Sequence, residues 1–388
     1  MFPALNGDCF LIRGGRANVL IDGGYAATFE GHLLPELTQI AREGQRLDLL
    51  VATHIDQDHI LGIIALLEAN GPAVPRTILE IDAIWFNSLR CLASRVSATL
   101  PAEAKQLVSA LARQGFQPRP IVGTVNQISA KQGSSLGALI RRCHYAWNGA
   151  DGNAGIREDT ARANLASDVF VRVLGPTQQR LDELHRFWVN ALTKRGYQGP
   201  FGSNDDLDEA FEMTCNRAPA LKSSKTTKIS AASNRTLDEV YESDKSLPNG
   251  SSISLLMTFE GARMLFLADA WAEDTVEAMK KLQAEGESLL FDAIKISHHG
   301  SLQNTSPELL TLIDAPVYFV SSNGGTHGHP DIEVLKAIVD RPAAFTRTLH
   351  LNYRTPASAA ICVHSPATGA VFCVVEDSTD WVDISCST

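Results

Sequence analysis

Short apolar runs alternate with amphipathic stretches along most of the chain, and this pattern predicts a mixed α/β protein. Apolar runs of strand length are at residues 9–14, 17–24, 47–54, 83–87, 168–176, 252–261, 262–270, 291–301 and 315–325. Helical spacing is found at residues 32–44, 60–70, 101–115, 177–196, 272–286 and 306–314. The order of these elements favours two sheets packed face to face with helices outside. Residues 359–376 are predicted to close the chain as a hairpin.

The character of the sequence changes between residues 150 and 248. A strand and a helix are predicted first, and residues 195–248 are then rich in Ser, Thr, Asn, Lys and Asp. This composition is typical of a mobile loop or an insert. We therefore predict one domain over residues 1–388 with an insertion at 150–248, whose loop part (195–248) could serve a protein partner or cover a site.

Charge and cysteine content narrow the class of protein. The 34 basic and 44 acidic residues give a formal net charge of −10, which disfavours simple electrostatic binding to nucleic acid. The seven cysteines form no CxxC pair, which is typical of a reducing compartment. No secretory leader and no apolar run of about 18 residues are visible. We expect a cytoplasmic protein that does not bind a membrane.

Metal-ligand residue types follow four of the predicted strands. They are His54, Asp56, Asp58 and His59 after the third strand, then Asp269, His298 with His299, and His327 with His329. Loops at strand ends are where α/β proteins concentrate their functional residues. One such loop means little, but four with the same residue types are hard to attribute to chance.

The first of these clusters contains more ligands than one ion needs from a single loop. Residues 54, 56 and 58 project to one side of an extended segment, and His59 begins the following helix. Imidazole and carboxylate ligands suit Zn²⁺, and also Mn²⁺ or Fe²⁺. Four ligands in six residues indicate two ions, and Asp269 could bridge them at a separation of about 3.5–4 Å.

With these elements assembled, the sequence resembles the metallo-β-lactamase superfamily, and in particular its ComEC-like branch. The matching pieces are "NGDCFLI", "NVLIDGG", "THIDQDHILG", "GSSISLLMTFEGARMLFLAD", "IKISHHGS" and "NGGTHGHP", between residue 6 and about residue 330. The resemblance implies a four-layer αβ/βα sandwich with a helical and loop insertion. Residues 150–248 match no family pattern.

The resemblance also implies roles for individual residues. His54 and Asp56 would bind one ion, Asp58 and His59 the other, and Asp269 would bridge them. One of His298 and His299 would complete the second site, and the sequence leaves open which. His329 would act as a general acid or phosphate contact, Asp58 would also orient the nucleophile, and His327 and Asn323 would contact substrate.

Some positions depart from the superfamily pattern or are best explained structurally. Asp56 replaces the second histidine of the common HxHxDH motif, a change that the ComEC-like branch shares and that shifts preference toward Mn²⁺. The first ion's last ligand has no clear match, and Asn87, His144 or water could supply it. Asp22, before a Gly-Gly pair, is interpreted as a turn or supporting carboxylate, and Asp8 as a turn residue.

Two divalent ions, with Zn²⁺ favoured over Mn²⁺, would lower the pKa of a bound water so that a hydroxide nucleophile exists at about pH 7. The leading hypothesis is a phosphodiesterase or nuclease acting on a nucleotide or nucleic acid. One alternative is an ester, thioester or lactam hydrolase, because the same chemistry serves those bonds. The other is a non-catalytic regulatory module that a metal stabilises.

Overall fold

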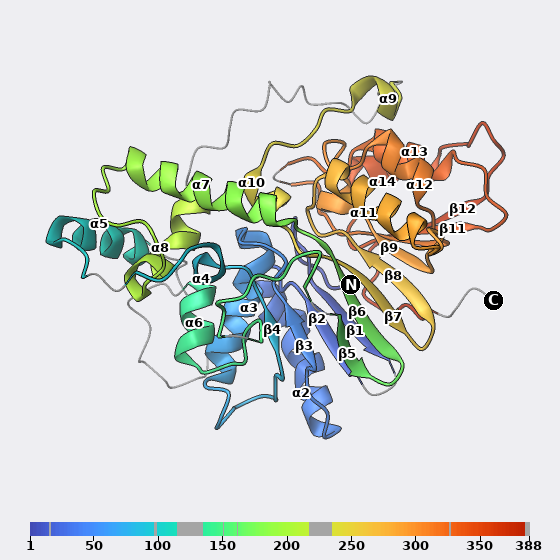
Figure 1. The fold of residues 1–388 in the computed structure, drawn as a ribbon. Helices are drawn as coiled ribbons and strands as arrows, with labels where there is room; N and C mark the ends of the chain where they lie inside the picture. The colour runs from blue at the N-terminus through green and yellow to red at the C-terminus, as the bar shows by residue number, and fades with distance from the viewer. Residues whose placement is uncertain are drawn as a thin grey trace. The chain divides into compact units, whose positions relative to one another are not determined.

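The computed structural model describes most of the chain, as two compact units (Figure 1). Unit 1 comprises Met1–Ala17, Arg157–Thr177 and Ala220–Thr388, and unit 2 comprises Asn18–Ile156 and Gln178–Pro219. Each unit contains strands and helices, so the predicted mixed α/β class is confirmed. The described residues are 1–14, 17–96, 99–114, 135–149, 151–160, 162–216, 235–325 and 327–384.

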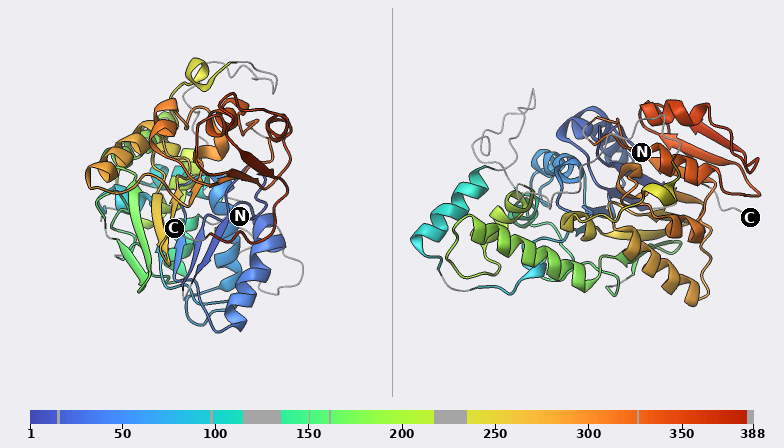
Figure 2. Two further views of the ribbon diagram at one scale, coloured as in Figure 1. Left: turned by 90° about the vertical axis from the view of Figure 1, so that its right-hand side faces the viewer. Right: turned by 90° about the horizontal axis from the view of Figure 1, so that it is seen from above.

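Unit 1 is built on an eight-stranded sheet with the order β12-β11-β10-β9-β8-β7-β6-β5, visible as a gradation from red to green (Figures 1 and 2). The strands β5 to β8 pair in antiparallel fashion, and β8 to β12 are parallel. The strands are β5 (Ala163–Ala166), β6 (Val169–Gly175), β7 (Ser254–Phe259), β8 (Ala262–Phe266), β9 (Ala293–Lys295), β10 (Val317–Val320), β11 (Arg347–Leu351) and β12 (Phe372–Val375). The unit also contains β1 (Phe10–Gly14), α9 (Leu237–Val240), α10 (Leu247–Gly250), α11 (Ala272–Ala284), α12 (Pro307–Leu312), α13 (Ile332–Val339) and α14 (Pro356–Cys362).

Three neighbouring parallel strands of this sheet, β8, β9 and β10, place the polar residues of unit 1. Their buried apolar side chains, such as Leu265, Ile294 and Tyr318, join the core formed with α11, α12 and α13. Because neighbouring parallel strands end at the same edge of a sheet, the segments that follow β8, β9 and β10 emerge together. These segments carry Asp269 and the His298–His299 pair.

The predicted hairpin at residues 359–376 is wrong. Residues Pro356–Cys362 form the helix α14, and β12 pairs in parallel with β11. Thr355 begins the helix with a capping box, in which its side chain accepts from the Ser358 amide while Ser358 bonds back. Parallel strands need a crossover connection, which α14 provides. The apolar run at the chain end predicted the strand but not its direction.

Unit 2 contains the parallel strands β2 (Ala17–Ile21), β3 (Leu49–Val51) and β4 (Ile84–Trp85), which pair in that order. Its helical segments are α1 (Ala26–Thr28), the π-helix η1 (Phe29–Leu33), α2 (Leu34–Arg42), α3 (Gln57–Asn70), α4 (Leu89–Leu92), α5 (Ala102–Arg113), α6 (Leu136–Arg142), α7 (Gln178–Lys194) and α8 (Asp205–Asn216). The apolar helix α3 buries most of its side chains. It directly follows the strand that delivers His54.

Helix α3 and the turn after β2 approach each other closely enough to require glycine. The Gly62 amide donates to Gly24 O at 2.8 Å, and the Gly23 amide donates to His59 O at 2.8 Å. A Cβ atom on Gly62 would lie 1.9 Å from Gly23 O, where the backbone must shift. The contact therefore fixes the start of α3 against the turn that carries Asp22.

Gly62→Ala should destabilise the protein by about 1–3 kcal/mol, because the added methyl group overpacks this contact and strains both hydrogen bonds. Urea unfolding followed by circular dichroism measures the change. Gly31→Ala is the matched control, since a Cβ atom at Gly31 would meet nothing within 4 Å. Equal stability of the two variants would show that the close contact has no energetic weight.

The stretch 195–248, predicted as a loop, contains helical segments. Helices α8 and α9 lie within it and α10 begins at its end, while residues 217–234 fall outside the described residues. Glu212 of α8 is fully buried and accepts hydrogen bonds from the Leu136 and Gly137 amides at 2.7 and 2.9 Å. Burial raises the pKa of Glu212 to about 7, although these two hydrogen bonds lower it. The side chain therefore caps the N-terminus of α6.

Within the described part of the chain, no helix combines the length and the apolar character that crossing a bilayer requires.

Candidate metal centre

The cluster at residues 54–59 occupies the connection between β3 and α3 in unit 2. His54 follows the strand, Asp56 is the N-cap residue of α3, and Asp58 and His59 lie in its first turn. The two histidine side chains are fully buried, while those of Asp56 and Asp58 are 32% and 19% exposed. The histidine rings lie 4.1 Å apart between centroids. This segment therefore gathers two imidazoles and two carboxylates, but α3 begins at Gln57, so Asp58 lies in the helix and not on the predicted extended segment.

Asp22 holds both histidines of this cluster in position. Its carboxylate bonds to His59 Nδ1 at 2.8 Å and accepts from the Thr53 amide and hydroxyl, each at 2.8 Å. The Thr53 hydroxyl in turn bonds to His54 Nδ1 at 3.1 Å. Histidines that bind metals in proteins use the other ring nitrogen for such a supporting hydrogen bond. Here that arrangement turns Nε2 of each ring toward the acids.

The distances from these Nε2 atoms are short enough for a shared ion. His54 Nε2 lies 3.8 Å from Asp56 Oδ2, and His59 Nε2 lies 4.0 Å from Asp58 Oδ1. These distances are longer than a hydrogen bond. Each is compatible with an ion between the two atoms, since ligand–metal distances of about 2.0–2.2 Å are typical of zinc.

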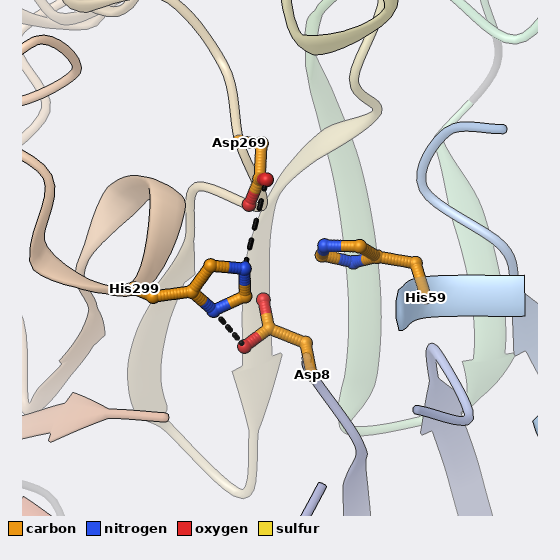
Figure 3. Close-up of side chains that lie close together, drawn as sticks. All are labelled: Asp8, His59, Asp269 and His299. Carbon is orange, nitrogen blue, oxygen red and sulfur yellow. Dashed lines mark ion pairs between the residues drawn. The ribbon is translucent and has the colours of Figure 1, made fainter. Parts of the chain in front are cut away.

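Unit 1 contains a second buried cluster, formed by Asp8, Asp269 and His299 (Figure 3). Each residue offers one ligand atom, and these atoms lie within 4.8 Å of one another. All three residues are at most 3% exposed. His299 Nε2 lies 3.7 Å from Asp269 Oδ2, and His299 Nδ1 lies 3.3 Å from Asp8 Oδ1. His59, which Figure 3 also draws, belongs to unit 2 and is described with the first cluster.

The neighbouring residues His298 and His299 lie at the same distance from Asp269. Nε2 of each ring lies 3.7 Å from Asp269 Oδ2. His299 Nδ1 bonds to the carbonyl oxygen of Ser321 at 2.8 Å, and His298 Nδ1 bonds to Asn304 Oδ1 at 2.7 Å. Both rings thus have a supporting partner on Nδ1. Both rings therefore present Nε2 to Asp269, and of the two it is His299 that belongs to the buried group of possible metal ligands.

Sequence reasoning missed one member of the unit 1 cluster, Asp8, and the lysine that contacts it, Lys295. Asp8 was interpreted as a turn residue, yet its carboxylate lies in the cluster and contacts Lys295 Nζ. Lys295 is 2% exposed and also donates to Ala268 O at 2.9 Å. Its Nζ lies 3.9 Å from Asp269 Oδ1. A lysine in the otherwise apolar strand β9 was the available signal, because a buried lysine requires a nearby acid.

The remaining predicted site residues, in the loop after β10, differ in how exposed they are. The His329 ring is 5.2 Å from that of His298, and His329 Nδ1 is 3.2 Å from Asp331 Oδ2. Burial lowers the pKa of His329, against an opposing effect of Asp331. His327 is exposed and stacks at 6.1 Å from His329, and Asn323 Oδ1 accepts from the Gly325 amide. The loop therefore brings His329 beside His298.

Neither side chain proposed as the first ion's last ligand lies among these clusters. The Asn87 amide group bonds in both directions to the backbone of Ile156, at 2.7 and 2.8 Å. His144 is exposed and follows the end of α6. The structure thus gives Asn87 a structural role, because both ends of its amide group are engaged by the backbone.

Comparison with known families is consistent with this description. The metallo-beta-lactamase superfamily matches residues 3–144, and no curated protein matches the chain. The matched stretch includes Asp8, Asp22 and the cluster at residues 54–59. The mixed α/β structure is consistent with the metallo-β-lactamase fold. Together, the family match and the buried His/Asp cluster support a metal-dependent hydrolase.

Proposed function

We propose that the protein is a metal-dependent phosphodiesterase that acts on a nucleotide or a nucleic acid. The buried cluster of Asp8, Asp269 and His299 carries the proposal, because two acids and an imidazole so close together suit a divalent cation. The sequence motifs of the ComEC-like branch support the phosphodiester as the bond that is cleaved.

The imidazole and carboxylate side chains suit two ions of borderline to hard Lewis acidity. We propose that each unit supplies metal ligands: His54, Asp56, Asp58 and His59 in unit 2, and Asp269, His298 and His299 in unit 1, where Asp8 is a further candidate. Imidazoles and carboxylates in this ratio suit Zn²⁺ and also Mn²⁺. When bound, such ions supply Lewis acidity and an activated water. Asp22 and Ser321 contribute by orienting the rings of His59 and His299.

The remaining residues have roles in proton transfer and orientation. Asp58, with a side chain 19% exposed, can orient a nucleophile through its second carboxylate oxygen. His329 lies beside His298, where it can donate a proton to a leaving oxygen or contact a phosphate. Asp331 bonds to His329 Nδ1, which leaves Nε2 for that proton transfer. We propose that His327 and Asn323 contact the substrate.

The net charge favours a small substrate. A chain with a formal charge of −10 repels long polyanions, so a nucleotide, or DNA presented by a partner, suits it better than free duplex. A protein partner could bind through residues 195–248, and we expect the protein to work in the cytoplasm. Cleavage of esters, thioesters or lactams is the alternative that the same residues allow.

Hydrolysis of bis-p-nitrophenyl phosphate and single-stranded DNA, with Mn²⁺ or Zn²⁺ added, tests the proposal. We expect turnover that falls at least about 100-fold in Asp58→Ala, since removing an orienting or proton-transfer group costs about 10²–10⁴-fold. Asp168→Ala, which removes an exposed acid, should leave the rate unchanged. Turnover of nitrocefin or a thioester without phosphodiester cleavage would favour the alternative. Phosphodiester turnover that survives Asp58→Ala would contradict the proposal.

A further inference from the structure

We infer that Asn304, held by Asp244, fixes the tautomer of His298 so that Nδ1 carries the proton and Nε2 is the ligand nitrogen. Neither residue lies in the stretch that matches the superfamily. Both belong to unit 1, as do His298 and Asp269. Asn304 and Asp244 are thereby positioning residues that act through His298.

Asn304 is completely buried, and its side-chain amide is bonded at both ends. Nδ2 donates to Asp244 Oδ2 at 3.0 Å and to the carbonyl oxygen of Asp269 at 3.0 Å. Oδ1 lies 2.7 Å from His298 Nδ1. Asp244 is 8% exposed and accepts a further hydrogen bond from the Ser246 amide at 2.9 Å. The carboxylate is therefore fixed from two sides.

This network permits only one orientation of the Asn304 amide. The Asp244 carboxylate and the Asp269 carbonyl are both acceptors, so the group that faces them must be the donor Nδ2. The acceptor Oδ1 then faces His298, and a bond between them requires a proton on Nδ1. The reversed amide would place oxygen against two acceptors in a buried position, which is strongly unfavourable.

A second contact of His298 Nδ1 does not reverse this assignment. Asn249 Nδ2 lies 3.4 Å from that nitrogen, beyond the usual range for an N–H···N hydrogen bond. The same Nδ2 donates to Asp244 Oδ2 at 2.7 Å, which is the shorter contact. Asp244 thus receives the amide groups of Asn249 and Asn304, and Asn304 remains the partner of Nδ1.

The backbone of the His-His segment is held in an unusual conformation that positions the ring. His298 and His299 have φ values of 45° and 57°, in the left-handed region that disfavours residues with a Cβ atom. The His298 amide donates to Ala268 O at 2.8 Å, and the Ser297 hydroxyl donates to Ala270 O at 2.7 Å. These bonds hold the segment after β9 against the segment that carries Asp269.

The Nε2 atoms of His298 and His299 are thus both oriented by a hydrogen bond to Nδ1, but the two rings use different partners. His299 uses the Ser321 carbonyl, which can only accept, and His298 uses the Asn304–Asp244 pair. A neutral imidazole has one donor and one acceptor nitrogen, so a proton fixed on Nδ1 leaves a lone pair on Nε2. That atom lies 3.7 Å from Asp269 Oδ2, where the proposed function places an ion.

Nitrogen NMR of the metal-free protein tests the tautomer without any reliance on hydrolysis. The spectrum is recorded at about pH 8, above the ordinary histidine pKa of about 6.5, and the His298 signals are assigned by their loss in His298→Gln. We expect Nδ1–H at His298 in the unmodified protein. Asn304→Leu should shift the population toward Nε2–H, whereas Asn249→Leu, which removes the amide with the longer contact to Nδ1, should keep Nδ1–H. His299 is the internal control and should keep Nδ1–H throughout.

Zn²⁺ binding gives a second readout, which also depends on the proposed metal site. Asn304→Leu should weaken binding about 10–100-fold, as loss of a supporting partner commonly does, whereas Asn249→Leu should weaken it less. Nε2–H at His298 in the unmodified protein, or Nδ1–H retained in Asn304→Leu, would overturn the inference. An Nδ1–H tautomer in a protein that binds no metal would leave the tautomer assignment intact and contradict the proposed function instead.

Discussion

Asp269→Asn is expected to remove bound metal and to lower phosphodiester hydrolysis by on the order of 10³-fold or more. The carboxylate lies 3.7 Å from Nε2 of both His298 and His299, so both rings share it as a neighbour. An amide retains the size but loses the charge that a divalent cation requires. Loss of the ion removes both the activated nucleophile and the charge stabilisation, effects worth about 10²–10⁴-fold and about 10²–10³-fold respectively.

Elemental analysis of the purified variant and initial rates with saturating Mn²⁺ measure this effect. Asp168→Asn is the matched control, because it makes the same change at an exposed carboxylate. Circular dichroism should show the same fold in both variants. Full metal content together with full activity in Asp269→Asn would refute the assignment of Asp269 as a shared ligand.

Lys295→Met should destabilise the metal-free protein by about 3–5 kcal/mol, because it leaves two buried carboxylates without their cation. The Lys295 ammonium group contacts Asp8 and lies 3.9 Å from Asp269, and all three side chains are at most 4% exposed. Methionine fills a similar volume, so the decrease in the free energy of unfolding is due to the lost charge and not to lost packing. Urea unfolding in the presence of a chelator measures the difference in the free energy of unfolding.

Two comparisons separate this electrostatic effect from a general loss of packing. Adding Asp8→Asn to Lys295→Met removes one of the two uncompensated buried carboxylates and should recover part of the lost free energy of unfolding. A bound divalent cation should also stabilise Lys295→Met more than the unmodified protein, since it replaces the missing positive charge. A variant that is equally unstable with and without Asp8→Asn and metal would contradict the electrostatic account.

The positions of most candidate ligands could be predicted because they follow strands. The apolar runs that became β3, β8 and β9 are strong local signals, and a residue placed directly after such a strand must emerge at the sheet edge. His54, Asp269 and the His298–His299 pair all follow this rule. Thr53, the supporting partner of His54, is its neighbour in sequence, whereas Ser321, which supports His299, follows the adjacent strand β10 and is 22 positions away.

The members that escaped prediction depend on contacts distant in sequence. Asp8 and Lys295 are 287 positions apart, and only the folded chain shows that the acid faces the ammonium group. Asn304 and Asp244 are 60 positions apart and carry no motif of their own. The direction of β12 was also missed, because an apolar run does not reveal whether it pairs in parallel with its neighbour. The capping residue Thr355 was the sequence signal for the crossover helix α14.

Metal content bears most directly on the central claim that this chain is a metal-dependent hydrolase. Elemental analysis of the unmodified protein, after reconstitution with Zn²⁺ or Mn²⁺ and removal of excess ion, should give two ions per chain. The same preparation should hydrolyse bis-p-nitrophenyl phosphate and lose that activity to a chelator. Well under one ion per chain after reconstitution, with no hydrolysis of any substrate tested, would contradict the account and favour a non-catalytic regulatory module.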